Sequence, residues 1–267
     1  MDFDEFLREA CHPLDLQWRK YRRRAARHRL RSRMSRLGIG EYAVYLSYLR
    51  AHPEESSAFA DLMAVTVSRF FRERACWQRL AGEIIPAYLD ARPPAGTFRA
   101  WSAGCCGGEE PFTLVILWKD LLAPSFPSLR LDVRATDIDG ASLARASRGS
   151  YPGSSLREIP QPLRGRWFRQ EGDLWVLHHE VRNSVKFEGS NLMTGKPPKK
   201  QDLVLCRYLV FTYYRGSRRL SAARKLASSM KGGGLLFIGR KEGLGPEEKE
   251  LFEPLAAECG IFRRREE

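Results

Sequence analysis

The sequence lacks three features that would each point to a particular class of protein. No run reaches the roughly 18 apolar residues that a membrane-spanning helix needs, and no apolar segment follows a basic stretch at the N-terminus, as it would in a secretory leader. The six cysteines form no Cys-x-x-Cys pairs with metal-binding spacing. We therefore expect a cytoplasmic protein with reduced thiols, without a membrane span or a metal site.

Acidic residues are absent from residues 18–36, where ten lysines and arginines occur. Apolar residues at loosely helical spacing predict a helix there, with a narrow buried stripe that includes Ala25 and a cationic outer face. The whole chain carries a net charge of +13. A solvated face is one explanation, but like charges four residues apart destabilise a helix. We therefore expect an acidic partner, either phosphate or an acidic protein surface.

The most informative segment is residues 101–112, which reads Trp-Ser-Ala-Gly-Cys-Cys-Gly-Gly-Glu-Glu-Pro-Phe. Residues 97–101 before it are short and aromatic, which predicts a strand, and the apolar residues 112–118 after it predict a buried helix. Glycines in such a loop let a ligand approach the backbone closely. The start of the helix offers unpaired N–H groups.

The two carboxylates at the end of this loop indicate what kind of ligand it would bind. Glu109 and Glu110 would repel the phosphates of a dinucleotide, and no P-loop lysine follows them. S-adenosylmethionine fits better, because it carries a sulfonium and an ammonium group and no phosphate. Glutamates and a proline also suit the first turn of any helix. That alternative does not explain the spacing of Gly104, Gly107 and Gly108.

Strands and helices alternate after the Pro- and Gly-rich linker at residues 91–96. We place a helical domain at residues 1–92 and an α/β domain at 97–267, with a small β insert at about 160–187. Alternation predicts a mostly parallel sheet, whose ligand lies at the carboxyl ends of the strands. Four residues singled out in the sequence fall at such ends, namely Gly104, Asp137, Asn191 and Tyr208.

Residues 65–74 allow two interpretations. The segment opens with β-branched and hydroxyl residues and closes with Phe-Phe-Arg-Glu-Arg. Its hydroxyls and an arginine could reach a ligand. Alternatively, Ser68 could be the N-cap of a helix that runs to Leu89.

Five of these segments, taken in order, resemble the chemotaxis receptor methyltransferases of the CheR family. They are Phe-Phe-Arg at 70–72, the loop at 101–112, Ala-Thr-Asp-Ile-Asp at 135–139, Asn-Leu at 191–192 and Cys-Arg at 206–207. The resemblance covers almost the whole chain. The asparagine that follows Cys-Arg in the family is Tyr208 here.

The resemblance implies an α/β fold, with a class I S-adenosylmethionine methyltransferase (Rossmann-like) domain, an N-terminal all-α domain and a small β insert. It implies that the methyl group of S-adenosylmethionine is transferred to a glutamate carboxylate of an acidic protein, such as a receptor cytoplasmic helix, leaving S-adenosylhomocysteine. The implied cofactor-binding residues are Thr66, Ser68, Arg72, Ala103, Gly104, Glu109, Glu110, Asp137, Ile138, Asn191, Leu192, Tyr208 and Leu209.

The resemblance also gives residues for the acceptor and the reaction. Arg22, Arg23 and Arg27 lie in the segment that would face the acidic substrate. Arg72 would orient the acceptor or the cofactor carboxylate, and we add Tyr213 as a residue lining the methyl path. Two other functions stay open from the sequence: transfer to a small molecule or other acceptor, which the change at Tyr208 favours, and a non-catalytic module that binds the cofactor or nucleic acid. Nucleic acid is the less favoured partner.

Overall fold

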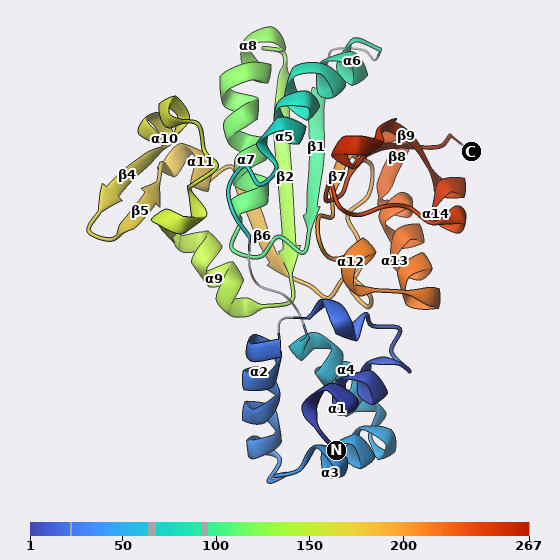
Figure 1. Cartoon of the computed structure of the whole chain (residues 1–267). Helices are drawn as coiled ribbons and strands as arrows, with labels where there is room; N and C mark the ends of the chain where they lie inside the picture. The colour runs from blue at the N-terminus through green and yellow to red at the C-terminus, as the bar shows by residue number, and fades with distance from the viewer. Residues whose placement is uncertain (22, 64–67, 92–95, 267) are drawn as a thin grey trace. The chain divides into compact units, whose positions relative to one another are not determined.

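The computed structural model describes residues 1–21, 23–63, 68–91 and 96–266 (Figure 1). The chain forms two compact units, each described here by itself. The helical unit comprises Met1–Val65 with Tyr208–Ala222, and the α/β unit comprises Thr66–Arg207 with Ala223–Glu267. The predicted site residues Arg22 and Thr66, and the side chain of Arg23, lie outside what the structure describes. In the described part of the chain, no helix is both long and apolar enough to cross a bilayer.

Short amphipathic helices around an aromatic core form the helical unit. Asp2 and Glu5 make a capping box that starts the first helix. Phe6 packs on Tyr45 and edge-on against Phe59, and all three rings are fully buried. The helices are α1 (Phe3–Cys11), α2 (Arg23–Arg36), α3 (Tyr42–Ala51), α4 (Pro53–Leu62) and α12 (Val210–Tyr213), with η1 (Trp18–Lys20) and the start of α13 (Gly216–Ser229).

Helix α2 divides its basic residues between two environments. Its buried residues follow a four-residue spacing and are Ala26, Leu30 and Met34. The prediction of Ala25 in this stripe is wrong, because Ala25 is exposed and Ala26 is buried in its place. Arg33 turns inward and forms a two-branched ion pair with the buried Glu55 of α4, with its Nε 3.0 Å from Oε1. Arg24, Arg27 and Arg31 are instead exposed to solvent; Arg27 covers the ring of Phe3.

A seven-stranded sheet forms the centre of the α/β unit, in the order β6-β2-β1-β7-β8-β10-β9. The first five strands in this order are parallel, which confirms the mostly parallel sheet that the alternating pattern predicts. β10 runs antiparallel to both of its neighbours. The strands are β1 (Gly96–Ala103), β2 (Leu129–Asp137), β6 (Val185–Gly189), β7 (Gln201–Leu205), β8 (Met230–Phe237), β9 (Phe252–Ala256) and β10 (Ile261–Arg264).

The register of the parallel strands brings their carboxyl ends to one edge of the sheet. Ala103 at the end of β1 pairs with Thr136 of β2. Asp137 at the end of β2 pairs with Gly189 of β6, and Leu205 at the end of β7 pairs with Phe237 of β8. Loops that leave these strands therefore start side by side.

Helices surround this sheet in the α/β unit. Helix α7 contacts β1 and β2, and α9 contacts β2 and β6 (Figure 1). The helical elements of this unit, apart from the end of α13, are α5 (Arg74–Arg79), η2 (Leu80–Ile84), α6 (Ile85–Asp90), α7 (Glu109–Leu117), η3 (Trp118–Leu122), α8 (Ala123–Ser125), α9 (Gly140–Arg148), η4 (Gly153–Ser155), α10 (Gln161–Trp167), α11 (His179–Arg182), α14 (Pro246–Leu251) and η5 (Ala257–Cys259).

Both expected domain limits differ from the compact units. The helices over residues 74–90 belong to the α/β unit. The ring of Trp77 packs edge-on against that of Phe237, with 5.0 Å between the ring centroids. The Tyr88 hydroxyl donates to the Asp202 carboxylate at 2.8 Å. Residues 92–95 of the expected linker lie outside the described residues, and the elements before and after them, α6 and β1, belong to one unit. The small sheet also starts earlier than residue 160, because β3 (Ser150–Pro152) pairs with β5 (Leu174–Leu177), which pairs with β4 (Phe168–Glu171).

The ion pair of Glu55 gives a stability prediction for the helical unit. Glu55→Gln leaves Arg33 and the Tyr45 hydroxyl, which lies 2.6 Å from Glu55 Oε1, without their charged acceptor. We expect the free energy of unfolding to fall by about 1–3 kcal/mol, measured by urea denaturation followed by circular dichroism. Glu54→Gln, at an exposed neighbour in the same helix, is the matched control and should leave the midpoint nearly unchanged. Equal midpoints for the two variants would contradict this role of Glu55.

Candidate cofactor site

The loop after β1 crosses the end of β2 before it enters α7. The backbone N–H groups of Gly104 and Cys105 both donate to the Thr136 carbonyl, at 2.8 and 3.0 Å. Gly104, Cys106 and Gly108 all have positive φ, at 78°, 50° and 85°. These left-handed residues turn the chain sharply, so the first turn of α7 begins close to the carboxyl edge of the sheet.

The glycines of the loop have different physical reasons to be there. A Cβ at position 107 would lie 2.5 Å from Nε of Arg145, and one at position 108 would lie 2.8 Å from the ring of Phe112. Packing and a positive φ explain Gly108, whereas the close contact at position 107 is with the end of the flexible Arg145 side chain. The spacing of the glycines, which favoured a ligand in the sequence, is weaker support for a ligand than the acids that follow.

Burial of the two glutamates distinguishes this loop from an ordinary helix start. Glu109 is 2% exposed and Glu110 is 7% exposed. Acidic side chains suit the first turn of a helix when water solvates them, but burying a carboxylate is costly unless it is paired. Oε2 of Glu109 has no hydrogen-bond partner among the described residues. The site therefore holds carboxylate oxygens that a cation would satisfy.

Glu110 is poised between its charged and neutral forms. Its Oε1 accepts a hydrogen bond from the Ser102 hydroxyl at 2.9 Å, and its Oε2 lies 3.8 Å from Nη1 of Arg207. Burial raises the pKa of Glu110 to about 7, although Arg207 and the Ser102 hydroxyl act in the opposite direction. A cation bound beside Glu110 would favour its charged form.

Asp137 ends β2 next to the glycine loop. Its Oδ2 accepts from the Cys106 N–H at 2.7 Å and its Oδ1 accepts from the Asp139 N–H at 2.9 Å. Burial raises the pKa of Asp137, and these two backbone donors oppose that effect. Two bonds leave further lone pairs on the carboxylate, so it can still accept hydroxyl donors. Ile138 beside it is one of the few exposed large apolar side chains.

The loop after β6 is tied to the same strand end. The N–H of Ser190 donates to the Asp137 carbonyl at 2.9 Å, which fixes the start of the loop. Asn191 accepts the Met193 N–H at its Oδ1, and its carbonyl accepts the Gly195 N–H. Asn191 and Leu192 are half-buried. The structure thus brings the predicted residues 103–104, 109–110, 137–138 and 191–192 to one edge of the sheet.

Residues 68–73 are not helical, so the interpretation of Ser68 as the N-cap of a helix to Leu89 is wrong. The helix begins at Arg74, because Phe71 and Glu73 have φ of 52° and 66°, which no helix accommodates. Phe71 donates its N–H to the Thr113 hydroxyl of α7, and the N–H of Glu73 donates to Glu158. A conformation this unusual, held by several bonds, is typical of functional segments.

Arg207 connects this segment to the glutamates. Its Nη2 donates to the Arg72 carbonyl at 2.8 Å and to the Glu73 carboxylate at 2.7 Å. Arg72, which we predicted to bind the cofactor, is also close enough to Glu110 for its charge to lower the pKa of that carboxyl. The 68–73 segment and the start of α7 therefore form one charged cluster within the α/β unit.

Besides the arginines of α2, the predicted residues Tyr208, Leu209 and Tyr213 belong to the helical unit. Tyr208 has φ of 57°, a backbone region that asparagine enters more easily than tyrosine. Leu209 directly precedes α12. The Tyr213 ring stacks on Tyr21 at 4.9 Å, and its carbonyl accepts the Gln17 N–H. These contacts give Tyr213 a packing role; its place on the methyl path stays a prediction.

The sequence interpretation missed several members of the charged cluster. Arg207 lies in the Cys-Arg segment at 206–207, which carries part of the family resemblance, but we predicted no role for it. The N–H of Arg240 donates to Glu73, and the buried Glu242 lies close enough to Glu110 to raise its pKa. Nothing in the sequence links residues 73, 158, 207 and 242, because only the fold brings them together. The acids near the start of α7 were the one signal that could have pointed to such a cluster.

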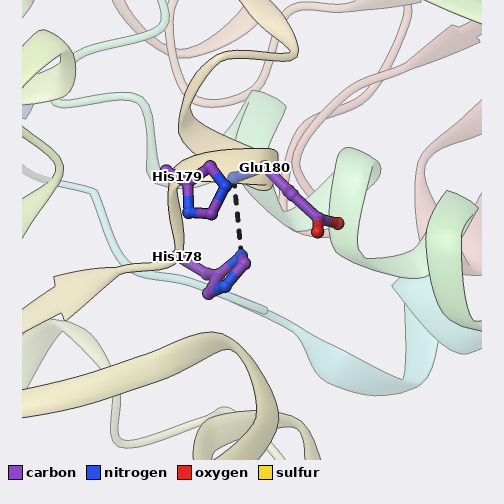
Figure 2. Close-up of side chains that lie close together, drawn as sticks. All are labelled: His178, His179 and Glu180. Atoms are coloured by element: carbon purple, nitrogen blue, oxygen red, sulfur yellow. Dashed lines mark hydrogen bonds between the residues drawn. The ribbon is translucent and has the colours of Figure 1, made fainter.

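A group of potential metal ligands lies elsewhere in the α/β unit. One ligand atom each of His178, His179 and Glu180 lies within 4.8 Å of the others, and all three residues are exposed. His178 Nδ1 accepts the Glu180 N–H and thereby caps α11, as Figure 2 shows. Lys119 approaches Glu180 to 3.4 Å. Helix capping and this ion pair explain the group better than a metal centre does.

Comparisons with known proteins agree with this geometry. A family model described as "CheR methyltransferase, SAM binding domain" matches residues 66–261, and one described as "CheR methyltransferase, all-alpha domain" matches residues 1–64. The Chemotaxis protein methyltransferase of Listeria innocua is 31% identical over 90% of this chain and 89% of its own length. The Probable chemotaxis protein methyltransferase of Rhizobium etli is 28% identical over 84% of this chain and 86% of its own length.

A solved structure offers a weaker likeness. The N-methyltransferase NodS from Bradyrhizobium japonicum, in complex with S-adenosylhomocysteine, shares 13% sequence identity and a TM-score of 0.40, over 77% of this chain and 93% of that one. The two family models and the relatives, and not this structure, show the family. The chain therefore belongs to the CheR methyltransferase family and is an S-adenosylmethionine-dependent methyltransferase, with a class I α/β fold and an N-terminal all-α domain.

Proposed function

We propose that this methyltransferase acts in the cytoplasm and methylates glutamate carboxylates on an acidic protein, namely a helical segment of a chemotaxis receptor. Membership of a family whose relatives are named chemotaxis protein methyltransferases supports the receptor. The observation that carries the proposal in this chain is the exposed arginines of α2, in a segment without acids. Guanidinium groups pair with carboxylates and would draw an acidic helix toward the enzyme.

The buried acids fit the cofactor. Glu110 would bind the ammonium of its methionine end, and the unpartnered Oε2 of Glu109 would add negative charge nearby. Asp137 would accept hydrogen bonds from the ribose hydroxyls, and Arg72 would pair with the carboxylate of the methionine end. Asn191, with Leu192 and Ile138, would border the adenine. When bound, S-adenosylmethionine supplies a methyl group on a positively charged sulfur.

The chain's own residues mainly need to align the acceptor and exclude water. A carboxylate is already a nucleophile at neutral pH, so no strong base is required. Positioning of two reactants can lower a barrier by about 7–11 kcal/mol. The attack also neutralises charge, which a dry site favours. The rings of Phe70 and Phe71, which are buried next to Arg72, would shield that side of the site from water.

The state of Glu110 predicts how cofactor affinity depends on pH. Below pH 7 the free enzyme holds Glu110 neutral, and a bound ammonium favours the ionised form, so binding releases a proton. We expect affinity for S-adenosylhomocysteine to rise from pH 5.5 to 7.5, with a limiting slope of about tenfold per pH unit. Calorimetry in buffers of different ionisation enthalpy would measure both the affinity and the released proton.

Substitution of the same residue tests its assignment. Glu110→Gln should weaken binding at pH 7.5 by about 10- to 100-fold, as expected for losing a bond to a charged group, and should flatten the pH profile. Glu250→Gln, at an exposed residue of α14, is the control and should bind as the wild type does. Wild-type affinity that does not change over this range would contradict the role of Glu110.

Charge reversal on α2 tests the acceptor. Arg24→Glu combined with Arg27→Glu should lower kcat/KM for an acidic protein acceptor by about tenfold or more at low salt, mainly through KM, because rim charges steer association. Affinity for S-adenosylhomocysteine should not change. The assay follows tritiated methyl transfer from S-adenosylmethionine into protein of a cell lysate, with release of methanol by alkali.

Two outcomes would count against the proposed acceptor. Lys199→Glu combined with Lys249→Glu makes the same change in net charge at exposed residues of the α/β unit and should retain activity. Equal losses in both double variants would show an effect of total charge and not of α2. Label that resists alkali, or enters small molecules alone, would reject carboxyl methylation of protein and favour a different acceptor.

A further inference from the structure

The buried guanidinium of Arg207 lies at the centre of the charged cluster. Arg207 is not among the predicted site residues. Its side chain is 3% exposed. The guanidinium carbon lies 4.5 Å from the ring centroid of Phe237 and 5.2 Å from that of Trp77. These two buried rings pack edge to face and hold the guanidinium in place.

Its two branches face different parts of the site. Nη2 donates to the Arg72 carbonyl and to the Glu73 carboxylate, while Nη1 faces Glu110 at 3.8 Å. The planar fork of arginine suits this double task, whereas a lysine presents one point charge. One side chain thus contacts both the segment that carries Arg72 and the acid at the start of α7.

The segment that Arg207 holds would not keep its shape unaided. Phe71 and Glu73 both have positive φ, a backbone region that is unfavourable for residues other than glycine. The Glu73 carboxylate accepts from Arg207 and also from the Arg240 N–H at 3.0 Å. Arg207 therefore acts together with Thr113 and Glu158, which accept the Phe71 and Glu73 N–H groups, to hold the backbone on both sides of Arg72.

We propose that Arg207 is a positioning residue of the cofactor site, which holds the Arg72–Glu73 turn and the Glu110 carboxylate in one arrangement that accepts the methionine end of the cofactor. This inference rests on the proposed roles of Glu110 and Arg72. Arg207 itself need not touch the cofactor. It acts through the backbone at Arg72 and through its positive charge beside Glu110.

The test measures binding of S-adenosylhomocysteine by calorimetry from pH 5.5 to 9 in variants of the full chain. Arg207→Gln removes the charge beside Glu110, so the midpoint of the pH profile should move up by about one unit, and affinity at pH 7 should fall by about tenfold or more. Arg207→Lys keeps the charge but loses the fork. The midpoint of the Arg207→Lys variant should stay near that of the wild type. Its affinity should lie between those of the wild type and the Arg207→Gln variant.

A second variant keeps the test informative if Arg207→Gln does not fold. Glu73→Gln weakens the anchor of Arg207 but leaves its charge in place, so affinity should fall without an upward shift of the midpoint. Arg79→Gln, at a surface ion pair with Glu83 and Glu258, is the control and should match the wild type. Thermal unfolding of each variant measures any general loss of stability.

The outcomes separate this inference from the proposed function. A wild type that binds without pH dependence would contradict the role of Glu110 and, with it, the positioning role. A pH-dependent wild type, together with an Arg207→Gln variant of unchanged affinity and midpoint, would overturn the positioning role alone. Reduced affinity in all three variants with no shift in any midpoint would also overturn it, because it would indicate structural damage.

Discussion

Burial of negative charge at the carboxyl edge of a parallel sheet is the constraint on which the candidate site depends. Glu109, Glu110 and Asp137 all lose most of their contact with water there, and burial raises the pKa of each. A protein tolerates such an arrangement when something compensates it. Arg207 and several backbone N–H groups provide part of the compensation, and a cationic ligand would provide more.

The topology explains why the acids meet at this edge. Each parallel strand delivers its following loop to the same side, so residues separated by 30 to 100 positions become neighbours. The glycine loop approaches the end of β2 through hydrogen bonds to Thr136, and the loop after β6 does so through Ser190. The sheet holds the strand ends rigidly, while the loops supply the chemistry.

Sequence reasoning reached the fold and much of this edge because those features are local. Alternating strands and helices, the glycine loop and the acids at 109, 110 and 137 can be read from short segments. Of its two interpretations of residues 68–73, the N-cap at Ser68 was wrong, because two left-handed residues keep this backbone out of a helix. Sequence reasoning also missed the contact of Arg207 with Glu73, since no short-range pattern predicts an ion pair across 134 residues.

Packing also explains why the domain limits differed from expectation. A linker rich in proline and glycine suggests a boundary, yet Trp77 and Tyr88 before it pack on the sheet that follows it. The buried stripe of α2 likewise depended on its neighbours, which selected Ala26, Leu30 and Met34. Composition locates turns well, but contacts between distant residues decide which elements share a core.

A crystal structure of the chain with S-adenosylhomocysteine would show whether the buried acids at this edge bind the cofactor. We expect the ligand's ammonium within about 3 Å of a Glu110 carboxylate oxygen, its ribose hydroxyls on Asp137, and Arg207 still bridging Arg72 and Glu73. A ligand that binds with its ammonium away from these acids, or an edge of the sheet that stays empty at saturating ligand, would show that the buried acids do not form the cofactor site.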